Sequence, residues 1–304
     1  MGTKYGSGTS GDKSGSCVIG NRISGVSADC TGSNRSNIPV GRKPRGGEMR
    51  KRIQILIGLL WIFAALFFIG KSVPVAREYI SFDRQQDEML HTFIQNEEVM
   101  QRQNDELETT IPDLRIDFTS LQRLNPDIIG WLYIPVLEIN YPILLGKDNE
   151  EYLHKNYLHK NQYLGSIFAH YQTSPLLDEP YTVLFGHNMR SGRMFGKLSK
   201  YQDKAFRDAN PFVYIYTPEK SYQCTIYACL HVNSSDPYVY TTGYEFGSLN
   251  YRELIDYTAT NAMYSCDLFP YAMDQVFCLS TCAGGGRQQE RFTVFCVVTS
   301  SHEK

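Results

Sequence analysis

A single uninterrupted apolar stretch constrains this chain more than any other feature. Residues 53–70 read IQILIGLLWIFAALFFIG, and Gln54 is the one strongly polar side chain among them. Eighteen helical residues rise about 27 Å, which is close to the ~30 Å hydrocarbon core of a bilayer. We therefore expect residues 53–72 to form a single transmembrane helix.

Lysine and arginine are concentrated on the amino-terminal side of this stretch. Residues 1–52 hold 10 Lys/Arg and 3 Asp/Glu, although the whole chain has a net charge of −2. By the positive-inside rule, the amino terminus stays in the cytoplasm and the residues after the stretch lie outside the cell. A cleaved signal peptide is the alternative, but no A-x-A cleavage site is present and the run is longer than a typical signal core.

The segment before the apolar stretch is rich in Gly and Ser and poor in large apolar side chains. We expect residues 1–52 to be a disordered cytoplasmic tail, because they cannot bury enough surface to fold.

Cys17 and Cys30 have twelve residues between them and no nearby His, so we expect no metal site there. The chain has no HExxH, paired CxxC or EF-hand pattern, and we expect no metal and no cofactor. A basic tail on an acidic body also predicts membrane lipid, and no nucleic acid, as a partner.

Residues beyond the apolar stretch divide into a helical part and a β-rich part. Apolar side chains recur at helical spacing among charges in residues 73–110, which predicts one or two helices that form a stalk or pack on the next domain. Residues 111–304 are a β-rich domain with a predicted helix at 251–263 and a short one within 195–209. Short β-branched and aromatic runs bounded by turn residues predict a sandwich or barrel. These runs are residues 130–135, 140–145, 181–187, 212–218, 221–232, 274–282 and 291–298.

The most reactive position predicted by the sequence is Cys282. The run DQVFCLSTCAGGG is a strand that ends at a thiol and continues into three glycines, which let other backbone approach closely. A nucleophilic thiolate needs nearby cationic or basic groups. His187, in LFGHNM, ends another predicted strand, and Arg291 opens the strand after the glycine loop. A hairpin would bring Cys282 and Arg291 together.

These motifs resemble the signature of the sortases. LSTC stands nine positions before an Arg that opens a strand, and LFGHNM resembles the sortase histidine motif. NPDIIGWLYIP, INYPILLGKDNEEYLHKNYL and GSIFAHYQ, in that order, resemble class B sortases in particular. The resemblance extends over residues 115–298. It implies a mainly β fold, a closed barrel of about eight strands, with helices and a single membrane anchor before it.

The resemblance also implies a chemistry. Cys282 would be the nucleophile of a cysteine transpeptidase, His187 the general acid and base, and Arg291 the group that stabilises the oxyanion. Arg287, in the glycine loop, is the alternative to Arg291, which we favour because it directly precedes the apolar strand. The residues expected on the groove for the sorting peptide are Asn149, Leu153, Ser280, Thr281 and, on a weaker match, Tyr238 and Val239.

The implied partners are secreted proteins with a carboxy-terminal sorting signal and an amine of a lipid II-like cell-wall precursor. The expected reaction is cleavage after Thr of an NPxT-like signal through a thioacyl enzyme, followed by attachment to that amine in a Gram-positive cell wall. A pilin polymerase that uses a Lys of another subunit as the amine stays open, as do a thiol protease and a catalytically silent scaffold.

The other cysteines and histidines receive no functional role from the sequence. Cys278 and Cys296 lie inside apolar strands, where a thiol is usually a small buried hydrophobic group. Cys224 and Cys229 would point to opposite faces of a strand, which argues against a bridge between them. We interpret His91, His154, His159, His231 and His302 as surface or core residues. The role of His170, in IFAHY, stays open.

Overall fold

The computed structural model describes residues 46–95, 111–282 and 289–304. The chain divides into two compact units, Met1–Phe63 and Ala64–Lys304. The predictions for residues 1–45, for Cys17 and Cys30, for the second half of the 73–110 segment and for Arg287 lie outside the described residues.

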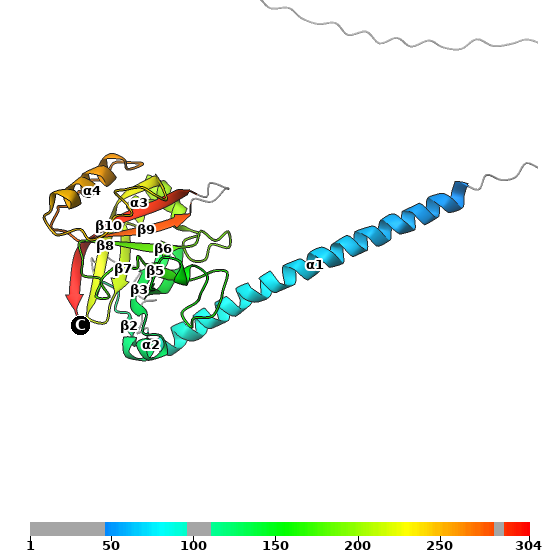
Figure 1. The fold of residues 1–304 in the computed structure, drawn as a ribbon, viewed down its shortest axis with the longest axis horizontal. Helices are drawn as coiled ribbons and strands as arrows, with labels where there is room; N and C mark the ends of the chain where they lie inside the picture. Colours follow the sequence, from blue (N-terminus) through cyan, green and yellow to red (C-terminus); the bar gives the residue numbers. More distant parts are fainter. Residues whose placement is uncertain (1–45, 96–110, 283–288) are drawn as a thin grey trace, which may run out of the picture. The chain divides into compact units, whose positions relative to one another are not determined.

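The described part begins with one long helix, α1 (Gly46–Phe93), drawn blue to cyan in Figure 1. It contains the apolar stretch, and its length and composition suffice to cross a membrane. The large apolar side chains of that stretch are exposed; Trp61, for example, is 73% exposed. Helical structure continues through Pro74 to Phe93, so the first part of the 73–110 segment is the end of this same helix.

The last turns of α1 belong to the second unit and pack on its β-rich part. Phe82 and Met89 are buried in two of its hydrophobic clusters. Arg193 donates from Nε to Oδ1 of Asp83 at 2.6 Å, and its guanidinium lies 5.0 Å from the ring centre of Tyr79. The end of α1 therefore contacts the β-rich domain through side chains between residues 79 and 89.

Among the described residues, eight strands form a closed barrel in the order β10-β8-β7-β3-β4-β5-β6-β9, with β10 also paired to β9. This confirms the predicted mainly β fold and its strand number. A separate pair of two-residue strands, β1 (Ile94–Gln95) and β2 (Arg115–Ile116), connects the end of α1 to the barrel. The barrel strands are β3 (Ile128–Ile134), β4 (Ile139–Leu145), β5 (Ile167–Ala169), β6 (Tyr181–Gly186), β7 (Phe212–Tyr216), β8 (Lys220–Asn233), β9 (Val276–Cys282) and β10 (Glu290–Glu303).

Most strand pairs are antiparallel, but β4 with β5 and β6 with β9 run parallel. Parallel neighbours need a long crossover rather than a tight turn. Between β6 and β9 the chain forms β7, β8 and a long connection that contains the helix α4 (Leu249–Thr260). This crossover brings the ends of β6 and β9 to the same edge of the barrel.

Helices cover the barrel where its outer face is apolar. The predicted helix at 251–263 is α4, which begins after Ser248, whose Oγ accepts from the Tyr251 backbone N–H at 3.3 Å. Tyr251, Leu254 and Ile255 are buried against the outer sides of β6, β8, β9 and β10. The remaining helices are α2 (Phe118–Leu124), α3 (Lys204–Ala209) and the short 3-10 turns η1 (Pro135–Leu137), η2 (Glu151–Leu153) and η3 (Leu198–Gln202).

Candidate active site

Strand register brings the three predicted catalytic positions together. In the parallel pair β6–β9, Gly186 is the register partner of Thr281, so the next residues along the two strands are His187 and Cys282. In the antiparallel pair β9–β10, Cys282 is the partner of Arg291. Three adjacent strands therefore place these residues at one end of the barrel. The side chain of Cys282 and residues 283–288 lie outside the described part of the chain.

The glycine before His187 is required by packing. A Cβ atom built on Gly186 would lie 2.5 Å from Cδ1 of Ile167 and 2.7 Å from Cδ2 of Phe195. Both distances are far shorter than a van der Waals contact. The chain leaving β6 is then fixed by a hydrogen bond from the Phe195 N–H to the His187 carbonyl oxygen at 3.0 Å. The Gly-His pair of the sequence motif thus reflects close packing directly beneath the histidine.

His187 lies between a backbone carbonyl and a second imidazole. Its Nε2 is 2.7 Å from the carbonyl oxygen of Leu153, in η2. The ring of His154 stacks on it, with centroids 5.4 Å apart and planes inclined by 27°. Burial lowers the pKa of His187 below its usual 6.5. The charge of His154 lowers this pKa further, whereas the hydrogen bond to the Leu153 carbonyl raises it. A lowered pKa keeps more of this imidazole in its basic form at neutral pH.

A pocket of about 270 Å³ opens beside these residues. Four of the six residues expected on the peptide groove line it, together with His187 and Arg291. Its described lining is Asn149, Glu150, Leu153, Phe168, His170, Phe185, Gly186, His187, Ser234, Tyr240, Ser280, Thr281 and Arg291. Aromatic rings and a few polar groups around a concave space are typical of a ligand site.

The polar side chains of the pocket differ in whether they have hydrogen-bond partners. Asn149 accepts a hydrogen bond on Oδ1 from the Tyr171 N–H at 3.0 Å. The Ser280 hydroxyl lies 2.8 Å from the Tyr240 hydroxyl. Thr281 is 3% exposed, and its Oγ1 has no hydrogen-bond partner among the described atoms. A buried hydroxyl of this kind gains free energy when a ligand atom completes its hydrogen bond.

Tyr238 and Val239 lie outside the described lining of this pocket. Val239 is fully buried and accepts a hydrogen bond from the Tyr181 hydroxyl at 2.8 Å, and Tyr238 stacks on Tyr257 with centroids 4.5 Å apart. The next residue, Tyr240, is the one from this segment that lines the pocket, where its ring stacks on Phe185 at 6.1 Å. Tyr240 has no distinguishing pattern in the sequence, because its position depends on how the β8–α4 connection folds.

Two histidines that carried no role in the sequence analysis belong to this site. His154, which the sequence analysis interpreted as a surface or core residue, stacks on His187. His170, which stayed open, follows β5, is 7% exposed and lines the pocket. Burial lowers the pKa of His170. A lowered pKa favours the neutral form of the His170 imidazole.

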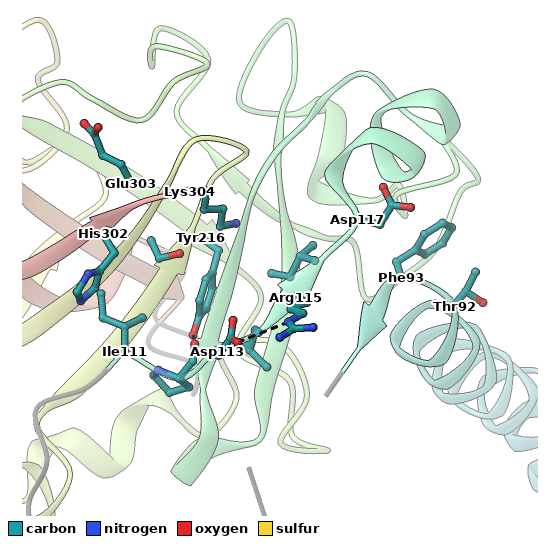
Figure 2. Close-up of a pocket in the computed structure, with 14 residues that line it drawn as sticks. Thr92, Phe93, Ile111, Asp113, Arg115, Asp117, Tyr216, His302, Glu303 and Lys304 are labelled. Carbon is teal, nitrogen blue, oxygen red and sulfur yellow. Dashed lines mark hydrogen bonds and ion pairs between the residues drawn. The ribbon is translucent and has the colours of Figure 1, made fainter. Parts of the chain in front are cut away.

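A cavity of about 730 Å³ lies away from this site (Figure 2). It is lined by the end of α1, residues 111–117, Tyr216 and residues 302–304, and the ion pair of Arg115 with Asp113 (3.6 Å) lies within it. Arg291 stands at the opposite end of β10 from residues 302 and 303. None of the predicted catalytic residues lines this cavity, so its size does not identify the site of chemistry.

The described cysteines other than Cys282 are all free thiols: Cys224, Cys229, Cys266, Cys278 and Cys296. All but Cys266 are buried, and burial raises the pKa of the Cys229 thiol to about 12. The same cause raises the pKa of Cys278. Thiols in this state are poor nucleophiles.

A known family matches this fold and this arrangement of residues. The family model of the sortase domain matches residues 132–299. The chain belongs to the sortase family. Sortase B of Listeria monocytogenes is 35% identical over 171 residues, and sortase B of Staphylococcus aureus is 27% identical over 169; each alignment covers 56% of this chain and 68% of the relative.

Solved sortases share the barrel. A sortase B of B. anthracis superposes with a TM-score of 0.60 at 26% identity, over 73% of this chain and 98% of that one. A Staphylococcus aureus sortase B–substrate complex gives 0.55 at 26% identity, over 60% and 84%. These similarities confirm the class B resemblance of the sequence motifs. Sortases are cysteine transpeptidases, so this sortase is an enzyme of that class.

Proposed function

We propose that this sortase cleaves a carboxy-terminal, NPxT-like sorting signal after its Thr and transfers the new acyl group to an amine of a cell-wall precursor. The observation that supports this most directly is the register of β6, β9 and β10, which places His187, Cys282 and Arg291 at one end of the barrel. The pocket of about 270 Å³ beside them is large enough for a few peptide residues. The Staphylococcus aureus relative has been solved with substrate.

In the proposed reaction, the Cys282 thiolate attacks the carbonyl carbon of the Thr. The tetrahedral intermediate carries its negative charge on the former carbonyl oxygen, beside Arg291. Its C–N bond then breaks, and the leaving amine takes a proton from the His187 imidazolium. A thioester between Cys282 and the Thr remains. The incoming amine gives a proton to His187 and attacks the thioester, an amide forms, and the thiolate is released.

Arg291 is suited to the oxyanion role by its chemistry. A guanidinium is permanently charged and offers several N–H donors in one plane. One of them, on Nη1, donates to the Glu290 carbonyl at 3.1 Å. Such donors, placed in advance where negative charge develops, contribute about 10²–10³ in rate in other acyl-transfer enzymes.

The lining of the pocket suggests how the peptide would be held. Asn149 and Leu153 come from the segment around η2, Ser280 and Thr281 from β9, and Tyr240 from the β8–α4 connection. The Thr281 hydroxyl oxygen is buried without a hydrogen-bond partner among the described atoms, and we propose that a polar peptide atom becomes its partner when the peptide binds. We propose Tyr240, in preference to Tyr238 and Val239, as the contact from its segment.

The membrane topology is part of this proposal. The apolar part of α1 would span the membrane with the basic residues before it in the cytoplasm, and the barrel would lie outside with the secreted substrates. Intact cells treated with a membrane-impermeant thiol reagent would test this. Labelling of Cys266 in intact cells supports this orientation, and labelling of Cys17 or Cys30 without Cys266 reverses it.

Quenched fluorescent peptides test the reaction. The full-length chain in detergent is incubated with peptides of the NPxT and LPxTG types, with and without triglycine, beside Cys282→Ala and the control Cys266→Ala. We expect cleavage after Thr and, with triglycine, an amide product; both should disappear in Cys282→Ala and persist in Cys266→Ala. Cleavage with water as the only acceptor would favour a thiol protease, and no cleavage with any peptide would favour a silent scaffold.

An assay with a second amine acceptor distinguishes wall anchoring from pilus assembly. The same assay with a Lys-bearing peptide in place of triglycine measures isopeptide formation. A product with triglycine alone supports the proposed function. A product with the Lys side chain alone would instead assign the chain to pilin polymerisation.

A further inference from the structure

The hydrogen bond of His187 determines which of its nitrogens carries the proton. Nε2 lies 2.7 Å from the Leu153 carbonyl oxygen, and a carbonyl oxygen only accepts hydrogen bonds. Nε2 must therefore be the donor. In the neutral ring, Nδ1 then has the lone pair, because a neutral imidazole carries one N–H.

The Leu153 carbonyl is held in place by the residue before it. Tyr152 is fully buried, and its carbonyl oxygen accepts from the Ser166 N–H at 3.0 Å. Its hydroxyl donates to Oδ2 of Asp127 at 2.5 Å and accepts from Nδ2 of Asn125 at 3.1 Å. His159 Nδ1 lies 3.3 Å from the same oxygen. The side chain of Tyr152 is therefore fixed at both its ring and its hydroxyl.

Two partners of this hydroxyl, Asn125 and Asp127, lie at the α2–β3 junction. Asn125 ends α2 with a hydrogen bond from its N–H to the Leu121 carbonyl oxygen, and its Oδ1 accepts from the Asp127 N–H at 2.9 Å. Burial and the Asp127 hydrogen bond raise the pKa of Tyr152, so the phenol stays a neutral donor. The α2–β3 junction thus anchors η2, which presents the carbonyl to His187.

Gly165 confines the same carbonyl from the other side. It has φ of +60°, and a Cβ built on it would lie 2.3 Å from the Leu153 carbonyl oxygen and 2.8 Å from its carbon. The oxygen is therefore packed directly against the Gly165 backbone. Tyr152 and Gly165 together leave the carbonyl little freedom to move away from His187.

We propose that Tyr152 is a positioning residue for His187: with Asp127 it holds the Leu153 carbonyl so that the imidazole keeps its proton on Nε2 and exchanges protons through Nδ1. This inference rests on the proposed function, in which His187 is the acid and base. It assigns a role to Tyr152 and Asp127, which lie outside the described lining of the pocket, and it names the nitrogen that would take the proton from the incoming amine.

Nitrogen NMR on histidine tests the tautomer without any need for activity. The full-length chain is labelled with [15N]histidine in detergent, and the His187 signals are identified by their loss in His187→Gln. Protonated and unprotonated ring nitrogens have well separated shifts, and couplings to the ring protons distinguish Nδ1 from Nε2. We expect a protonated Nε2 and an unprotonated Nδ1 at a pH where the ring is neutral. A protonated Nδ1 would overturn the proposal.

Tyr152→Phe tests the anchor, because it removes the hydroxyl and keeps the buried ring. We expect a mixed tautomer of His187 and a fall in kcat of at least about tenfold, part of the 10²–10⁴ that a well-placed acid–base group contributes. KM should change less than kcat. Asp127→Asn should act in the same direction, and it provides the test if Tyr152→Phe does not fold. An unchanged tautomer together with an unchanged kcat in a folded variant would refute the role of Tyr152.

Tyr251→Phe is the matched control. Tyr251 is also fully buried, and its hydroxyl donates to the carbonyl oxygens of Pro180 at 2.6 Å and Asp274 at 2.7 Å, beneath α4. The Tyr251→Phe variant should lower stability without changing the His187 tautomer. If Tyr251→Phe changed the tautomer as much as Tyr152→Phe does, the effect of Tyr152→Phe would reflect a general loss of packing. Failure of the proposed function gives a different result, because the wild-type chain would then form no amide product with any peptide, whatever the tautomer of His187.

Discussion

The Cα atoms of Cys282 and Arg291 are register partners across β9 and β10, at the last residue of one strand and the second residue of the other. The ladder of backbone hydrogen bonds between the two strands fixes the spacing of these two positions. The same ladder makes Arg291 the stronger candidate for the oxyanion role than Arg287, which lies outside the described residues.

Arg291→Lys separates the geometry of the guanidinium from its charge. We expect kcat/KM for a cleaved peptide to fall about 100-fold, because lysine keeps the charge but loses the planar set of donors. Arg252→Lys, at an exposed position on α4, is the control and should leave kcat/KM unchanged. A large loss in Arg287→Lys combined with normal activity in Arg291→Lys would reverse the assignment.

Thiol reactivity should distinguish Cys282 from the other barrel cysteines. Cys278 and Cys296 are fully buried, and burial raises the pKa of both thiols. A methanethiosulfonate reagent should therefore modify Cys282 at least about tenfold faster than either of them, with peptide mass spectrometry to locate the label. Equal and slow labelling of all three would support the silent scaffold.

His154→Gln should change the pH dependence of the enzyme. The charge of His154 contributes to lowering the pKa of His187, so its removal should raise that pKa. The other described titratable groups that line the same pocket, Glu150, His170 and Arg291, stay in place. The pH midpoint of the His187 titration, followed by NMR and by kcat/KM against pH, should move upward. His302→Gln, at the far end of β10, should not move it, and an equal shift there would contradict the local origin.

Gly186→Ala should damage both stability and activity. Its Cβ would overlap Cδ1 of Ile167 and Cδ2 of Phe195, and overpacking of this kind costs about 1–3 kcal/mol. Urea unfolding measures the loss. Ile167→Val removes the closer of the two atoms, so the double variant should lose less than the sum of the single variants. If the losses in unfolding free energy of the two single variants simply added in the double variant, the Ile167 side chain would not be the source of the clash.

Local patterns in the sequence were sufficient to predict most of the strands and the main helices. β-branched and aromatic runs between turn residues predict most of the barrel strands, because strand formation depends on near neighbours and on alternation. The same holds for α4 and for the apolar stretch of α1, whose character follows from composition over a few turns. Pro74 is the exception: the helix continues through it to Phe93, and the packing of Phe82 and Met89 stabilises the part beyond it.

By itself, the sequence determined the strands and the apolar helix, and it predicted the three residue types of the site, since each depends on short stretches of chain or on motifs shared with the sortases. Only the tertiary structure decided that β6 and β9 pair in parallel, that His154 stacks on His187, that Tyr240 lines the pocket and that Tyr152 anchors the Leu153 carbonyl. These contacts join residues from different elements. Their register depends on the packing of the whole barrel, which no local pattern of residues encodes.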